Sequence, residues 1–75
     1  MFERITIDTN QMNGEPCIRN LRIPVATIIT MMAQGITTDN ILKYYPDLEI
    51  ADIEATLNFA AETVREKELP LIKTA

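Results

Sequence analysis

The chain has 75 residues, of which 47% are apolar and 24% charged, and its formal net charge of −4 arises from an acidic second half. This composition is typical of one folded domain. The chain has no histidine, serine or tryptophan and only one cysteine, which excludes Ser-His-Asp and Cys-His catalytic sets, a Cys/His zinc site and an internal disulfide. Because there is also no long apolar run and no basic-then-apolar leader, we expect a cytoplasmic, non-enzymatic protein without a membrane span, cofactor or metal.

Within one domain of residues 1–75, the first part, residues 1–23, is predicted to be a β ribbon. Ile5 and Ile7 alternate with polar neighbours from the second residue onward, which is the period of a half-buried strand. After a polar loop, a turn at residues 19–22 is expected to close a short hairpin, because asparagine accepts a positive φ more readily than most residues. The residues on which this ribbon depends are Gly14, Pro16, Ile18, Asn20, Ile23 and Pro24.

A three-helix core is predicted over residues 24–68, and its first helix spans residues 24–34. Pro24 has the φ that suits the first helical position, and Gly35 suits the left-handed residue that ends a helix. The apolar side of this helix recurs at helical spacing and consists of Val25, Ile28, Ile29 and Met32.

A second, short helix is predicted over residues 38–44. Thr37 is a good N-cap for it, and Asp39 in its first turn complements the helix dipole. Pro46 disfavours helical angles at Tyr45, so the helix ends before that residue.

The third helix is predicted to begin at Glu49 or Ile50 and to run to about Glu68, followed by a tail at residues 69–75. Its apolar residues gather along one side, which we expect to face the core: Ile50, Ile53, Leu57, Ala60, Ala61 and Val64. On this interpretation Phe59 lies on the opposite side, where it is either covered by the ribbon or exposed as an interface anchor.

Three helices in this order form a minimal helix-turn-helix core, so the predicted fold class is mainly α, a short N-terminal β ribbon followed by a three-helix, helix-turn-helix-like bundle. The third helix would then be the candidate recognition helix. Its early outward positions are predicted to include Asp52, Glu54 and Asn58, with no lysine or arginine before Arg65. Since affinity for duplex DNA comes chiefly from cations, we expect the isolated chain to bind DNA weakly.

Three segments together, "GEPCIRNLRIPV", "GITTDNILKYYPDL" and "DIEATLNFAA", resemble a small prokaryotic family catalogued as domain of unknown function 433. The resemblance covers residues 4 to about 62. It implies a helix-turn-helix-like fold and, for many members, the role of antitoxin in a type II toxin–antitoxin pair, often beside a PIN-like nuclease. The chain departs from the family pattern at Asn20-Leu21, where the family has Gly-Thr, and at Glu49, where the family caps the third helix with threonine.

Four residues are candidates for binding a partner: Arg19, Arg22, Glu54 and Phe59. The guanidinium groups of the two arginines suit carboxylates or phosphates of a partner, although they equally suit the acidic third helix of the same chain. We expect an antitoxin-type interaction module that binds and neutralises a toxin, such as a PIN-like nuclease, and the alternative is a DNA-binding helix-turn-helix transcriptional regulator. The small core also favours a homodimer.

Overall fold

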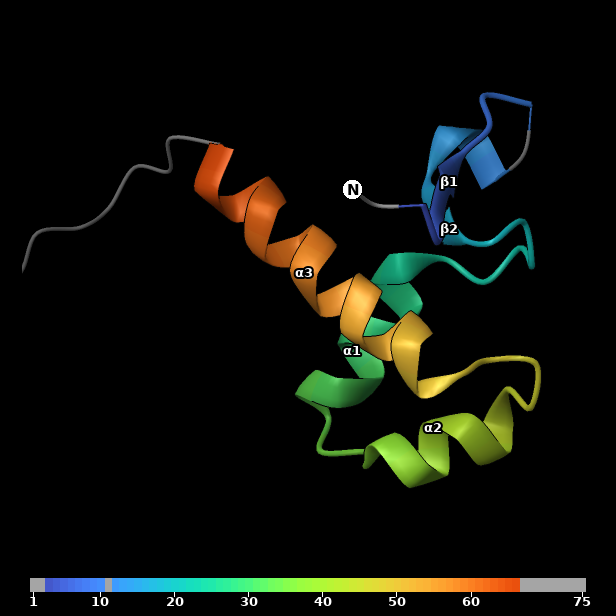
Figure 1. Cartoon of the computed structure of the whole chain (residues 1–75), viewed down its shortest axis with the longest axis vertical. Helices are drawn as coiled ribbons and strands as arrows, with labels where there is room; N and C mark the ends of the chain where they lie inside the picture. The colour runs from blue at the N-terminus through green and yellow to red at the C-terminus, as the bar shows by residue number, and fades with distance from the viewer. Residues whose placement is uncertain (1–2, 11, 67–75) are drawn as a thin grey trace, which may run out of the picture.

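The computed structural model of the chain, which describes residues 3–10 and 12–66, places a two-stranded antiparallel sheet beside three helices (Figure 1). The elements in chain order are β1 (Ile5–Ile7), a 3-10 turn η1 (Met12–Gly14), β2 (Pro16–Ile18), α1 (Val25–Ala33), α2 (Thr38–Tyr44) and α3 (Ile50–Glu66). The predicted fold class, mainly α with a short N-terminal β ribbon, is confirmed. The predicted tail at residues 69–75 and the predicted end of the third helix at Glu68 lie outside the described residues.

The ribbon is built from β1 and β2, whose antiparallel register pairs Ile5 with Ile18 and Ile7 with Pro16. The strand predicted to start at residue 2 is shorter than expected, because β1 begins at Ile5 and residue 2 lies outside the described part. Beyond β2 the chain turns back on itself, and the Ile18 N–H donates to the Ile23 carbonyl at 3.0 Å. The predicted hairpin is therefore present, although its far side forms only an isolated bridge to Pro24 and not a strand.

The turn at residues 19–22 is held in left-handed backbone geometry. Arg19, Asn20 and Arg22 have φ values of 45°, 61° and 60°. The prediction of a positive φ at Asn20 is thus confirmed, and asparagine tolerates this geometry better than most residues. The same geometry is unfavourable for an arginine, and at Arg19 it is supported by the hydrogen bonds that the side chain donates to Asp52 and to the Asp47 carbonyl.

Helix α1 begins one residue later than predicted, since Pro24 is its N-cap, with φ −65° and ψ 141°. The prediction that Pro24 is the first helical residue was therefore wrong by one position. The helix also ends one residue earlier than predicted, at Ala33, with Gln34 as its C-cap. The left-handed geometry predicted for Gly35 is confirmed by its φ of 85°; its N–H donates to the Met32 carbonyl, and the Ile36 N–H donates to the Met31 carbonyl. This is a Schellman motif, which satisfies carbonyls that a helix end leaves without partners.

Helix α2 has the predicted bounds. The Thr37 hydroxyl accepts a hydrogen bond from the Asn40 N–H at 3.2 Å, which confirms Thr37 as the N-cap. The backbone leaves helical geometry at Tyr45, where φ is −125° and ψ 79°, immediately before Pro46.

The core lies where the three helices and the end of β2 meet, and its buried cluster is Ile18, Val25, Ile28, Ile41, Leu48 and Ile53. The predicted apolar sides of α1 and α2 supply Val25, Ile28 and Ile41 as expected. For α3 the predicted core stripe was wrong. Only Ile53 of that stripe is buried, and four of its members, Ile50, Leu57, Ala61 and Val64, are exposed.

Candidate functional site

The face that α3 turns toward the rest of the molecule is polar near its N-terminus. Asp52 and Thr56, one turn apart, have no exposed surface at all. The sequence-based placement of Asp52 on the outside of the helix was therefore wrong. A wholly buried carboxylate needs charged or hydrogen-bonding partners, since the free energy of burying it alone is prohibitive.

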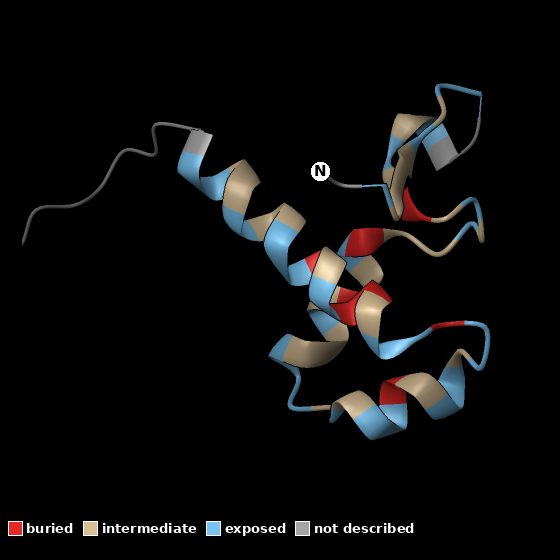
Figure 2. Cartoon of the chain, viewed as in Figure 1, coloured by how far each residue is buried: buried red, intermediate tan, exposed pale blue. Residues whose placement is uncertain are grey.

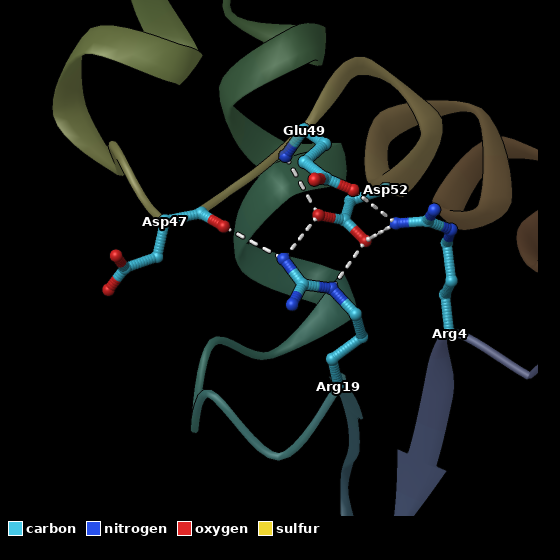
Figure 3. Close-up of polar contacts among 5 residues, drawn as sticks. All are labelled: Arg4, Arg19, Asp47, Glu49 and Asp52. Carbon is cyan, nitrogen blue, oxygen red and sulfur yellow. Dashed lines mark hydrogen bonds and ion pairs between the residues drawn. The ribbon is translucent and has the colours of Figure 1, made fainter.

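Asp52 finds these partners in the ribbon (Figure 3). Arg19 donates to Oδ1 of Asp52 through Nε at 2.9 Å and to Oδ2 through Nη2 at 2.8 Å, the bidentate geometry that guanidinium groups form with carboxylates. Arg4 donates to Oδ1 at 2.9 Å and to Oε1 of Glu49 at 2.8 Å. With the Glu49 N–H at 2.8 Å on Oδ2, the Asp52 carboxylate accepts four hydrogen bonds. We call Arg4, Arg19, Glu49 and Asp52 the arginine–aspartate cluster.

Electrostatics in this cluster favours the charged form of Asp52. Its hydrogen bonds with Arg19 are the largest cause of a pKa far below the ordinary value for aspartate, and burial opposes this shift without reversing it. The pKa of Arg19 is raised in turn, chiefly by the same hydrogen bonds. A carboxylate so fully engaged is a poor proton acceptor near neutral pH, and its ion pairs join the ribbon to α3.

Local sequence explains how the cluster assembles. Glu49 immediately precedes α3, and Asp52 occupies the third helical position, from which its side chain reaches back to the Glu49 N–H as in a capping box. Arg19 comes from the left-handed turn, and its Nη2 also donates to the Asp47 carbonyl at 2.8 Å in the linker between α2 and α3. The signal that could have identified Asp52 was the spacing of two acidic residues, Glu49-x-x-Asp52, at a helix start.

The four sequence-predicted partner-binding residues therefore occupy different environments. Arg19 forms an ion pair with Asp52 of α3, so of its two predicted roles it has the one within the chain and not the contact with a partner. Arg22, three residues on, is exposed and forms no hydrogen bond or ion pair with the described residues. Glu54 is exposed on α3, whereas Phe59 is half-buried and packs against the core cluster. The structure does not bring the four together into one site.

The exposed residues of α3, pale blue along the helix in Figure 2, include three large apolar side chains. Ile50, Leu57 and Val64 are 60%, 49% and 59% exposed, and they follow one another at seven-residue intervals. We call these three residues the α3 stripe. Ala61 is also exposed, and Glu54 lies on the same side by helical spacing, because it is four residues after Ile50 and three before Leu57. In Figure 1 the C-terminal half of α3 extends past the ends of α1 and α2.

The described residues contain neither a cluster of metal ligands nor a helix that could span a membrane. Residues 3–10 and 12–66 contain no group of three or more metal-ligating side chains of the His, Cys, Asp and Glu types placed to hold an ion. Among these residues, none of the helices has both the length and the apolar character needed to span a membrane.

The fold and the cluster define the class of protein: a small domain in which arginines tie a β ribbon to the last helix of a three-helix bundle. The chain belongs to the family described as "protein of unknown function (DUF433)", whose model matches residues 5–60. That range includes the ribbon strands, Arg19, Asp52 and most of α3. No curated protein and no solved structure matches the chain.

Proposed function

We propose that the chain is a non-enzymatic, cytoplasmic interaction module of the antitoxin type, which binds and neutralises a toxin partner such as a PIN-like nuclease. The observation that carries the proposal is the α3 stripe, because large apolar side chains exposed in a row favour contact with another protein. The arginine–aspartate cluster supports the proposal indirectly. Arg4 and Arg19 are ion-paired with Asp52 in the same chain, so the cations of the ribbon are engaged and do not form a free phosphate-binding surface.

The same surface argues for a protein partner in preference to DNA. On the described part of α3 the exposed charged residues are Glu54 and Arg65, and Glu49 precedes the helix. A recognition helix needs cations at positions that reach phosphates or bases, and a helix with apolar and acidic early positions lacks them. The carboxylate of Glu54 beside apolar side chains instead complements a cation-lined groove, such as that of an RNA-cleaving protein.

The test uses the product of the neighbouring gene, where that gene encodes a PIN-like nuclease, with RNA cleavage as the readout. We expect stoichiometric addition of the chain to stop cleavage, and Glu54→Arg to weaken inhibition at least tenfold. The matched control is Glu15→Arg, which makes the same charge change on the exposed loop before β2 and is expected to inhibit as the unmodified chain does. Full cleavage at a molar excess of the chain would refute the proposal, and steeply salt-dependent, submicromolar binding of the chain to duplex DNA would favour the transcriptional regulator instead.

A further inference from the structure

The loop between β1 and β2 contains an asparagine followed directly by a glycine. Asn13 is exposed, and its side chain forms no hydrogen bond with the described residues. Its backbone has φ 56° and ψ 29°, which interrupts the short turn η1, and Gly14 follows with φ 77°. The side-chain amide of Asn13 is therefore accessible both to solvent and to the main chain that follows it.

We propose that Asn13 is a site of spontaneous deamidation, in which the Gly14 nitrogen closes a five-membered succinimide ring on the Asn13 side chain. The Gly14 nitrogen loses its proton to a base from the solvent and bonds to Cγ of Asn13. The bond from Cγ to Nδ2 breaks, and Nδ2 takes up a proton from solvent and leaves as ammonia. Water then opens the ring at either carbonyl, which yields aspartate or an isoaspartyl linkage through the side chain. No atom is oxidised or reduced in these steps.

The surroundings of Gly14 favour ring closure in the folded chain. Closure requires rotation about ψ of Asn13, away from 29°, so that the Gly14 nitrogen approaches Cγ. A side chain on the following residue obstructs that approach, and glycine has none. A Cβ placed on Gly14 would meet nothing nearer than Cα of Thr9, at 3.9 Å, so the neighbouring chain also leaves this side open.

The other described asparagines lack this combination. Asn20 shares the exposure and the left-handed geometry, with φ 61°, but it precedes Leu21, which packs against the core cluster. Asn10 precedes a glutamine. Asn40 and Asn58 are exposed within α2 and α3, where helical hydrogen bonds hold ψ. Asn20 is therefore the internal comparison that isolates the effect of the following glycine.

The reaction changes both the charge and the backbone of the ribbon. Either product adds one negative charge to a net charge of −4. The isoaspartyl product also adds one carbon atom to the main chain, close to the start of β2, where Ile7 pairs with Pro16. We expect this end of the ribbon to loosen, while the end tied by Arg19 to Asp52 keeps its ion pair. Because the released ammonia does not return, the modified fraction rises with the age of the protein.

The test follows the unmodified full chain in a mildly alkaline buffer, because base removes the proton from the Gly14 nitrogen. Peptide mapping by mass spectrometry measures the loss of each asparagine, and methyl transfer by an isoaspartyl-specific methyltransferase detects the isoaspartyl product. We expect Asn13 to react at least about tenfold faster than Asn20, since only Asn13 precedes glycine. The matched variant is Asn13→Gln, which keeps the amide but requires a larger ring, and it should remove the methylation signal. Equal rates at Asn13 and Asn20 would overturn the inference.

A parallel incubation in guanidinium chloride tests what the fold contributes, again with the unmodified chain. We expect Asn13 to react in the folded chain at no less than about one third of its rate in the denatured chain, because the loop leaves the site open. Asn40 and Asn58 should be slowed by folding, since their helices must open first. A larger slowing at Asn13 would overturn the inference, because the fold would then protect the loop.

Discussion

Asp52→Asn is the substitution that tests the arginine–aspartate cluster most directly. The side chains have nearly the same shape, but the amide nitrogen of asparagine donates where Oδ2 of Asp52 accepts from Arg19 and from the Glu49 N–H. The variant therefore loses at least two of the four hydrogen bonds and the negative charge between two guanidinium groups. Taking about 1–2 kcal/mol for each lost hydrogen bond to a charged group, we expect the free energy of unfolding to fall by about 2–4 kcal/mol.

Urea denaturation at pH 7, followed by far-ultraviolet circular dichroism, measures this loss. The matched control is Glu54→Gln, which removes a carboxylate two residues along the same helix where the side chain is exposed. We expect that control to change the free energy of unfolding by no more than about 0.5 kcal/mol. Equal stabilities of Asp52→Asn and the unmodified chain would refute the structural role of the cluster.

The pH dependence of the same pair gives an independent check. The pKa of Asp52 is lower in the folded state than the ordinary value of about 3.9 in the unfolded chain. Its contribution to stability is therefore fully present above about pH 5 and is lost as the pH falls through 3.9 toward the folded-state pKa. We expect the difference in free energy of unfolding between the unmodified chain and Asp52→Asn to shrink between pH 5 and pH 3, and a constant difference would contradict the assigned cause.

Three further predictions concern the turn and the helix caps. Arg22→Ala is expected to leave the thermal midpoint unchanged, whereas Arg19→Ala should lower it, and a lowered midpoint for Arg22→Ala would show an internal role that the described contacts lack. Thr37→Ala should cost about 1 kcal/mol and lower the thermal midpoint by about 4–8 °C through loss of the α2 cap, while Thr37→Ser retains it. Glu49→Thr should stabilise the fold by about 0.5–1 kcal/mol, because threonine is a better N-cap for α3. The substitution removes the hydrogen bond from Arg4 to Glu49, but Arg4 keeps its hydrogen bond to Asp52. A lower urea midpoint would contradict this prediction.

Features set by local chemistry could be predicted from the sequence. The bounds of α2, the Thr37 cap and the left-handed Gly35 depend on residues a few positions apart, so propensity and capping rules suffice. The one-residue error at Pro24 is of the same local kind. The contacts of Arg19 with Asp52, 33 positions away, depend instead on how the ribbon and α3 pack together, and no local rule contains that information.

The rotation of α3 could not be predicted, because the periodicity argument assumes that the most apolar side of a helix faces its own core. Here the two arginines of the ribbon need a buried carboxylate, and Asp52 can meet them only if its side of α3 turns inward. Ile53 and Phe59 still contribute apolar contacts on that side. The other large aliphatic residues of α3, Ile50, Leu57 and Val64, are consequently directed toward solvent.

This inverted arrangement has a physical consequence for the free chain. Thr56, one turn after Asp52, has a buried hydroxyl with no hydrogen-bond partner among the described residues, so the inner face of α3 carries an unsatisfied polar group. The outer face carries Leu57 and two further large apolar side chains that gain nothing from solvent. Both features lower the stability of a small domain whose margin is already thin. A partner that covers the outer face would bury these side chains, and this gain supports the proposal that the α3 stripe is an interface.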